Sequence, residues 1–168
     1  MDLDLLSQPD LAARIKSVHR AFPTGVTIVT TTGEAGPLGL AVNAFSSVSL
    51  DPPSILVCVN RSSASHDAFL TNDHFAVSIL AADQQPVAQR FAKSGGDKFD
   101  GLAWEKGPYG MPLICGAAAT LELRMIERKP FGTHTILFGE ILSADTSGKA
   151  SLLYAQGKFF DAATAQQV

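Results

Sequence analysis

Apolar side chains recur at helical spacing near the start of the chain. Leu11, Ile15, Val18 and Phe22 follow one another at intervals of three or four residues, which predicts an amphipathic helix over about residues 8–22. Ser7 can cap this helix, and Pro9 falls near its first turn, where a missing N–H costs little. Two shorter helices are predicted over residues 65–71 and 84–93.

Runs of β-branched and apolar residues predict strands over most of the remaining chain. The predicted strands cover residues 26–32, 38–50, 54–59, 75–80, 117–127, 134–144 and 152–160. Residues 129–132 join two of them as a hairpin, and residues 94–111 form the longest irregular stretch, a candidate functional loop. Because strands outnumber helices, the pattern favours one mainly β domain over residues 1–168, an antiparallel β-barrel with peripheral helices.

Composition narrows the function classes. Of the 168 residues, 46% are hydrophobic and 17% charged, with a net charge of −3, as in a folded domain. No segment gathers Lys and Arg, so neither nucleic acid nor an anionic membrane is an expected partner. The start of the chain lacks the pattern of a signal peptide. Cys58 and Cys115 lie in apolar runs and are interpreted as buried thiols in a cytoplasmic protein.

The common catalytic motifs are missing from the sequence. It has no G-x-G-x-x-G after a strand, no P-loop, no H-E-x-x-H and no G-x-S-x-G, so the sequence supports no Rossmann site, NTPase, zincin or serine hydrolase. The four histidines are scattered without the spacing of metal ligands.

Several segments resemble the flavin reductase-like family of short-chain NAD(P)H:flavin oxidoreductases. They are residues 22–31 (FPTGVTIVTT), 39–53 (GLAVNAFSSVSLDPP), 75–80 (FAVSIL), 98–99 (KF), 132–134 (GTH) and 153–154 (LY). The resemblance implies a Greek-key split β-barrel that forms a homodimer with the flavin at the interface. It also implies hydride transfer from NADH, or NADPH, to FMN, or FAD, and delivery of reduced flavin to the oxygenase of a two-component monooxygenase.

Within this resemblance, the chemistry of a flavin selects candidate residues for three parts of the cofactor. The pyrimidine edge needs short polar groups and backbone N–H donors, and the ring needs an apolar seat; the phosphate needs hydroxyls, N–H groups or a cation at a loop that enters a helix. The ring candidates are Ala41, Val42, Asn43, Ala44, Phe45, Ser46, Ser47, Ser49, Phe91 and Phe99. The phosphate candidates are Asn60, Arg61, Ser63, Ser65, Lys93 and Lys98.

The residues expected to contact the nicotinamide are assigned only from their positions in the family pattern. His134 is the expected catalytic residue there, and Tyr154 is a further candidate. The family usually has an acid before this histidine, where the chain has Thr133, so the sequence departs from the family pattern beside the residue expected to contact the nicotinamide. Two alternatives stay open: a flavoprotein that retains FMN and reduces another acceptor, such as a cobalt corrinoid or a metal chelate, and a flavin-binding module without turnover.

Overall fold

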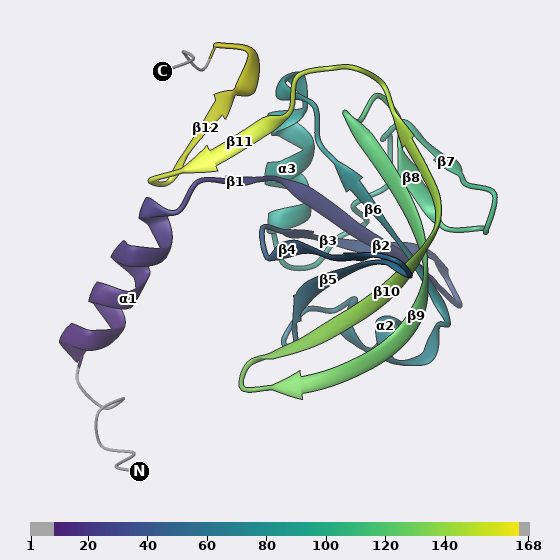
Figure 1. Cartoon of the computed structure of the whole chain (residues 1–168), viewed down its shortest axis with the longest axis horizontal. Coiled ribbons are helices and arrows are strands. Elements are labelled where there is room, and N and C mark those ends of the chain that lie inside the picture. Colours follow the sequence, from purple (N-terminus) through teal and green to yellow (C-terminus); the bar gives the residue numbers. More distant parts are fainter. Residues whose placement is uncertain (1–8, 165–168) are drawn as a thin grey trace.

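The computed structural model of the chain describes residues 9–164 and shows an antiparallel β-barrel with peripheral helices (Figure 1). The helices are α1 (Pro9–Ala21), α2 (His66–Thr71) and α3 (Gln85–Ala92). The strands are β1 (Thr24–Gly25), β2 (Thr27–Gly33), β3 (Gly36–Val42), β4 (Phe45–Leu50), β5 (Pro53–Asn60), β6 (His74–Ile79), β7 (Trp104–Lys106), β8 (Pro112–Ile114), β9 (Ala119–Phe131), β10 (His134–Thr146), β11 (Leu152–Ala155) and β12 (Lys158–Asp161). The mainly β antiparallel barrel predicted from the sequence is confirmed.

Seven strands form the barrel sheet, in the order β3-β2-β6-β9-β10-β5-β4, and each pair is antiparallel. The two end strands, β3 and β4, are consecutive in the chain and are joined by Asn43 and Ala44 alone. The N–H of Cys58 on β5 donates to the carbonyl of Ala44 at 3.1 Å. The sheet therefore curls until its β3 edge lies beside β5, with a seam between them.

The core of the barrel follows from the alternation of buried and exposed positions along its strands. On β10, Thr135, Leu137 and Gly139 face inward while their neighbours are half-buried. Phe75 on β6 is fully buried against them, and its ring occupies the space that a side chain at position 139 would need. Glycine at this position is therefore required by packing.

The N-terminal helix stands clear of the barrel in Figure 1. It is joined to the barrel through β1, which pairs with β11 in a small separate sheet. Val18 of α1 is 69% exposed and Phe22, directly after the helix, is 72% exposed, so these apolar side chains are not packed into the barrel core. No helix within residues 9–164 combines the length and apolar character needed to cross a bilayer.

Four sequence-based boundaries were wrong. Strand β9 continues to Phe131, so the connection expected over residues 129–132 is a tight turn at Gly132 and Thr133. The strand expected over residues 38–50 is two strands, because the chain leaves the β3 edge at Asn43 and turns to pair with β5. The irregular stretch 94–111 contains β7, which pairs with β8. The last strand is a hairpin, β11–β12, whose turn needs the positive φ of Gln156 and Gly157. The expected cap Ser7 lies outside the described residues.

Candidate flavin-binding site

Strand β3 is an edge strand, and its free edge offers backbone groups to a ligand. The carbonyl of Gly39 accepts hydrogen bonds from side chains outside the sheet, so the backbone of Gly39 points away from β2. Alternate residues of an antiparallel edge strand point their N–H and C=O groups in the same direction. The backbone of Ala41 therefore also faces the open edge, which suits a ligand with alternating donors and acceptors.

One end of this edge opens into a cleft of about 960 Å³ beside α1, which we call the helix cleft. Its walls bring together four of the ring candidates, Asn43, Ala44, Phe45 and Ser46, with Tyr154 from β11. Asn43, Ala44 and Ser46 are exposed. Thr24 also lines the cleft, and its hydroxyl is buried without a hydrogen-bond partner among the described residues.

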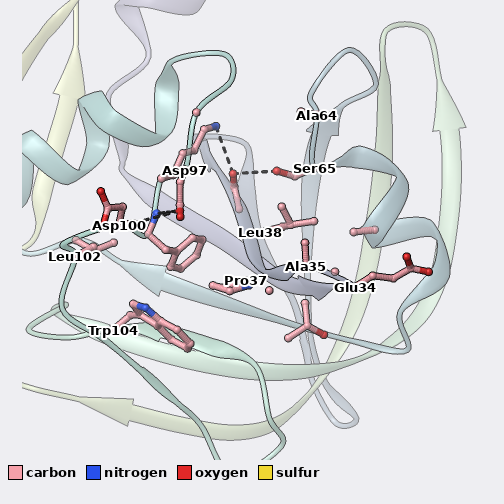
Figure 2. Close-up of a pocket in the computed structure, with 18 of the residues that line it drawn as sticks. Glu34, Ala35, Pro37, Leu38, Ala64, Ser65, Asp97, Asp100, Leu102 and Trp104 are labelled. Atoms are coloured by element: carbon pink, nitrogen blue, oxygen red, sulfur yellow. Dashed lines mark hydrogen bonds between the residues drawn. The ribbon is translucent and has the colours of Figure 1, made fainter.

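The middle of β3 borders a second cleft, of about 1140 Å³, between the β2–β3 hairpin, α2 and the loop that precedes β7. We call it the hairpin cleft; Figure 2 shows its labelled lining residues. Its lining includes Gly39, Ser65, Lys98 and Phe99, of which the last three are sequence-predicted site residues. The two clefts are connected in sequence by β3, since Gly39 lines one and Asn43 the other.

The hydrogen bonds at Gly39 join the two candidate phosphate ligands. The hydroxyl of Ser65 donates to the Gly39 carbonyl at 3.1 Å, and the Lys98 ammonium donates to the same oxygen at 3.4 Å and to the Phe91 carbonyl at 3.1 Å. The two hydrogen bonds to the Gly39 carbonyl are drawn as dashed lines in Figure 2. As an anchor for an anion, Lys98 keeps one of its three N–H donors unused by these bonds, whereas the Ser65 hydroxyl would donate to the same anion only by turning away from the Gly39 carbonyl. Burial lowers the pKa of the Lys98 ammonium below its ordinary value.

Gly39 is needed for close approach at this point. A Cβ there would lie 3.0 Å from the Phe91 ring, from the Thr30 side chain and from the Val29 carbonyl oxygen. Phe91 itself is only 1% exposed and packs behind β3, and the Lys98 ammonium lies 6.0 Å from the centre of its ring. Phe91 therefore supports the site from the core without lining either cleft.

The polar side chains of the loop after β5 form hydrogen bonds with other groups of the same chain. The Asn60 carboxamide oxygen accepts from the N–H and hydroxyl of Ser62, and the Arg61 guanidinium donates to the Gly132 carbonyl at 3.3 Å. The Ser63 hydroxyl accepts from the N–H of Ser65. This is the geometry of a capped turn, and none of the three predicted ligands Asn60, Arg61 and Ser63 lines either cleft.

The remaining predicted residues line neither cleft. Lys93 is exposed at the C-terminal end of α3. Ser47 and Ser49 lie on β4 beyond the helix cleft. Val42 is 5% exposed and packs into the core.

His134 lies at the start of β10, opposite Asn60 on β5. It is half-buried, and its Nδ1 is 2.9 Å from the Thr133 hydroxyl oxygen. The threonine that replaces the usual acid of the family therefore still contacts the imidazole, as a neutral hydrogen-bonding partner. His134 lines neither cleft within the described chain.

Sequence reasoning missed one wall of the hairpin cleft. The β2–β3 turn, from Thr32 to Leu38, and Trp104 were not among the predicted site residues, although both line this cleft. A signal was present, since the only tryptophan of the chain lies in the glycine-rich stretch that composition marks as a functional loop.

Comparison with known proteins gives consistent matches over nearly the whole chain. The family described as "Flavin reductase like domain" matches residues 19–163. The FMN reductase (NADH) SmoA of Agrobacterium fabrum is 44% identical over 139 residues, which are 83% of this chain and 79% of that protein. The reductase component of the flavin-dependent trigonelline monooxygenase of Acinetobacter baylyi is 38% identical over 92% of this chain, which spans 51% of that protein.

A solved structure agrees with these matches. The NADH:FAD oxidoreductase SgcE6 of Streptomyces globisporus C-1027, in complex with NAD and FAD fragments, superposes with a TM-score of 0.85 and 38% identity. The match covers 91% of this chain and 93% of that one.

Proposed function

The chain belongs to the flavin reductase-like family, and we propose that it binds FMN along the free edge of β3 and reduces it with NADH. The main support for this proposal is the placement of polar and cationic groups along that edge. Asn43 lies at one end and the Lys98–Ser65 anchor at Gly39 lies at the other. Four residues of extended chain span roughly 13 Å, a length that suits a flavin ring linked to a phosphate through a ribityl chain.

In this proposal, each residue has a binding or orienting task. Asn43, Ala44 and Ser46 contact the ring in the helix cleft, the backbone of Ala41 meets its polar edge, and Lys98 with Ser65 holds the phosphate. When bound, FMN accepts the hydride that NADH supplies. Because that transfer needs no acid or base, the protein contributes mainly by holding the partners in register. His134 is the proposed contact of the nicotinamide.

We propose further that reduced flavin passes to the oxygenase component of a monooxygenase. The trigonelline relative is named as the reductase component of such a system. Because NADH is available in the cytoplasm, we also propose that the protein is cytoplasmic.

We propose that a second copy of this chain packs against the exposed apolar residues of α1. The exposed Val18 and Phe22 lie beside Asn43 and Phe45 in the helix cleft, so a partner that buries them also closes the ring end of the flavin site. Val18→Glu is expected to shift the sedimentation coefficient from dimer to monomer and to weaken FMN binding, because burying a charge at such a contact is costly. The exposed Gln89→Glu, on α3, is the matched control. A wild-type monomer that binds FMN fully contradicts the proposal.

The phosphate anchor predicts a ligand-specific effect of Lys98. Lys98→Gln is expected to weaken FMN about tenfold, or ~1.4 kcal/mol, and to leave riboflavin, which has no phosphate, nearly unchanged. Because the pKa of Lys98 is lowered, its charge is lost at a lower pH than for an ordinary lysine. Wild-type affinity for FMN should therefore fall as pH rises through that lowered pKa, and the variant should lack this step. Fluorescence titration of both flavins measures it, and equal losses for FMN and riboflavin reject the assignment.

His134 predicts an effect on the nicotinamide. His134→Ala is expected to raise the KM for NADH or to lower kcat severalfold while FMN affinity barely changes. A change in KM alone indicates lost uniform binding, and a change in kcat alone indicates lost orientation in the transition state. Steady-state rates at varied NADH and FMN measure both. If the variant instead loses FMN and keeps its NADH kinetics, the histidine belongs to the flavin and the two cofactors are placed wrongly.

A further inference from the structure

The loop between β5 and α2 continues the sheet beyond the end of β5. Strand pairing between β5 and β10 ends at Asn60 and His134. Past that point, the N–H of Arg61 donates to the Thr133 carbonyl at 3.0 Å, and the Arg61 guanidinium donates to the Gly132 carbonyl at 3.3 Å. The loop therefore holds both residues of the β9–β10 turn, which directly precede His134.

The start of α2 holds the residue on the other side of His134. Thr135 is 1% exposed, and its hydroxyl oxygen lies 2.9 Å from Nε2 of His66, which is itself 6% exposed. Nδ1 of the same imidazole lies 3.2 Å from a carboxylate oxygen of Asp67. Because an ionised carboxylate only accepts, the N–H of the neutral ring points to Asp67, and Nε2 accepts from the Thr135 hydroxyl. His66 lines neither cleft, so this buried bond joins α2 to β10 outside the proposed flavin site.

These contacts fix the backbone on both sides of His134. Successive residues of a strand point to opposite faces, so Thr135 faces the core while the His134 side chain lies on the outer face. Nδ1 of His134 meets the hydroxyl of Thr133 at 2.9 Å, and Thr133 belongs to the turn that Arg61 holds. The position of the imidazole therefore follows the position of the turn.

The other end of the loop is anchored separately. The Ser65 hydroxyl donates to the Gly39 carbonyl on the proposed flavin edge, and the N–H of Ser65 donates to the Ser63 hydroxyl within the loop. Loss of the contacts made by Arg61 or Thr135 leaves both of these bonds in place. A turn that has lost its support should therefore affect the reaction with NADH and not the affinity for FMN.

We propose that Arg61, His66 and Thr135 are positioning residues for His134, which hold the β9–β10 turn so that the imidazole keeps one place for the nicotinamide. The proposal rests on the proposed function, in which His134 contacts the nicotinamide. It gives a role to loop groups that bond to their own chain and line neither cleft. Because a small displacement of an orienting group lowers a rate steeply, hydrogen bonds remote from the reacting atoms affect hydride transfer.

The first measurement is the steady-state rate with NADH. Arg61→Ala removes the exposed contact, and Thr135→Val removes the buried hydroxyl with little change of shape. We expect kcat/KM for NADH to fall about threefold in the first variant and about tenfold in the second, while FMN affinity stays near that of wild type. Rates are taken per FMN-binding site, because a misfolded fraction lowers the number of sites and the rate together.

Two control variants accompany this measurement. Thr135→Ser keeps the hydroxyl and is expected to restore most of the rate. Arg124→Ala removes another exposed arginine, which pairs with Glu140 of β10 away from the turn, and should react with NADH as wild type does. A rate that Thr135→Ser fails to restore shows that the hydroxyl is not the group responsible, and overturns the proposal.

Substitution of His134 separates positioning from a general structural role. In the His134→Ala background, Arg61→Ala and Thr135→Val are expected to cause no further loss of kcat/KM for NADH, because the group that they position is absent. Each single variant should change the same parameter, KM or kcat, that His134→Ala changes, by a smaller factor. Losses that multiply in the double variants overturn the proposal, and so do wild-type NADH kinetics in both single variants where His134→Ala is impaired.

An NMR signal of His134 distinguishes failure of this proposal from failure of the proposed function. The chain has four histidines, and the Cε1–H signal that disappears in His134→Ala belongs to His134. It is expected to shift in Arg61→Ala, to stay in place in Arg124→Ala, and to move farther in Thr135→Val than in Thr135→Ser.

The NMR result is decisive whatever the kinetics of His134→Ala. A His134 signal that stays in place in Arg61→Ala, or that moves equally in the two Thr135 variants, overturns the proposal. If His134→Ala keeps wild-type NADH kinetics, the nicotinamide role in the proposed function is contradicted, while a shifted signal still supports the positioning of the ring by the loop.

Discussion

Replacing Asn43 with leucine is expected to weaken FMN binding by more than tenfold, which is about 1.4 kcal/mol or more. Asn43 is exposed in the helix cleft between β3 and β4. In the proposed site its carboxamide meets the polar edge of the flavin, so leucine removes a hydrogen-bonding partner and leaves that edge against an apolar group. Fluorescence titration with FMN measures the change.

The same substitution should leave the fold intact, because the Asn43 side chain is outside the core. A thermal melt within a few degrees of wild type is therefore expected alongside the lost affinity. Gln89→Leu makes the same change from amide to apolar side chain at an exposed position of α3, away from both clefts, and should bind FMN normally. Wild-type affinity in Asn43→Leu would place the ring elsewhere.

Adding one methyl group at Gly139 is expected to destabilise the protein by about 3 kcal/mol, near the upper end for overpacked cores. A Cβ at this position would lie 2.5 Å from Cζ of Phe75 and 3.0 Å from Cβ of Leu123, and both side chains are fully buried. The Phe75 ring has little room to move, because it belongs to the buried core cluster of the barrel together with Leu123 and Leu137. Urea denaturation of Gly139→Ala measures the loss.

A second substitution tests the cause of that loss. Phe75→Leu removes the part of the ring that the new methyl group would strike, so Gly139→Ala/Phe75→Leu should lose less stability than the two single changes added together. Gly25→Ala is the control, since a Cβ there meets nothing within 4 Å, and it should stay within about 0.5 kcal/mol of wild type. Strictly additive losses would show that the strain at Gly139 has another origin.

The elements of the fold were predictable where one local signal determined them. The apolar spacing of α1 and the β-branched run of β2 lie within a residue or two of the expected bounds. The break at Asn43 and Ala44 was not predictable from propensity, because it depends on which strand β4 pairs with once the sheet has curled. The short β7 was missed for the same reason: its partner, β8, lies beyond a turn in a stretch rich in glycine and proline.

The candidate site was likewise predictable from the sequence only in part. The sequence placed Asn43, Phe45 and Lys98 in a flavin site, and the fold brings them to the two clefts that flank β3. It did not reveal that Arg61 is held by the Gly132 carbonyl, since that contact joins segments 71 residues apart. Trp104 was overlooked because a lone aromatic residue in an irregular stretch has no periodic pattern that indicates its role.

The most direct test of the central claim is the oxidation of NADH by the purified protein with FMN present in air. The nicotinamide absorbance is expected to fall at a rate that rises with enzyme and saturates with both FMN and NADH, and to fall only slowly when either protein or flavin is omitted. A folded protein that consumes NADH no faster than the protein-free mixture, with FMN or FAD as acceptor and with NADPH in place of NADH, would contradict the assignment as a flavin reductase.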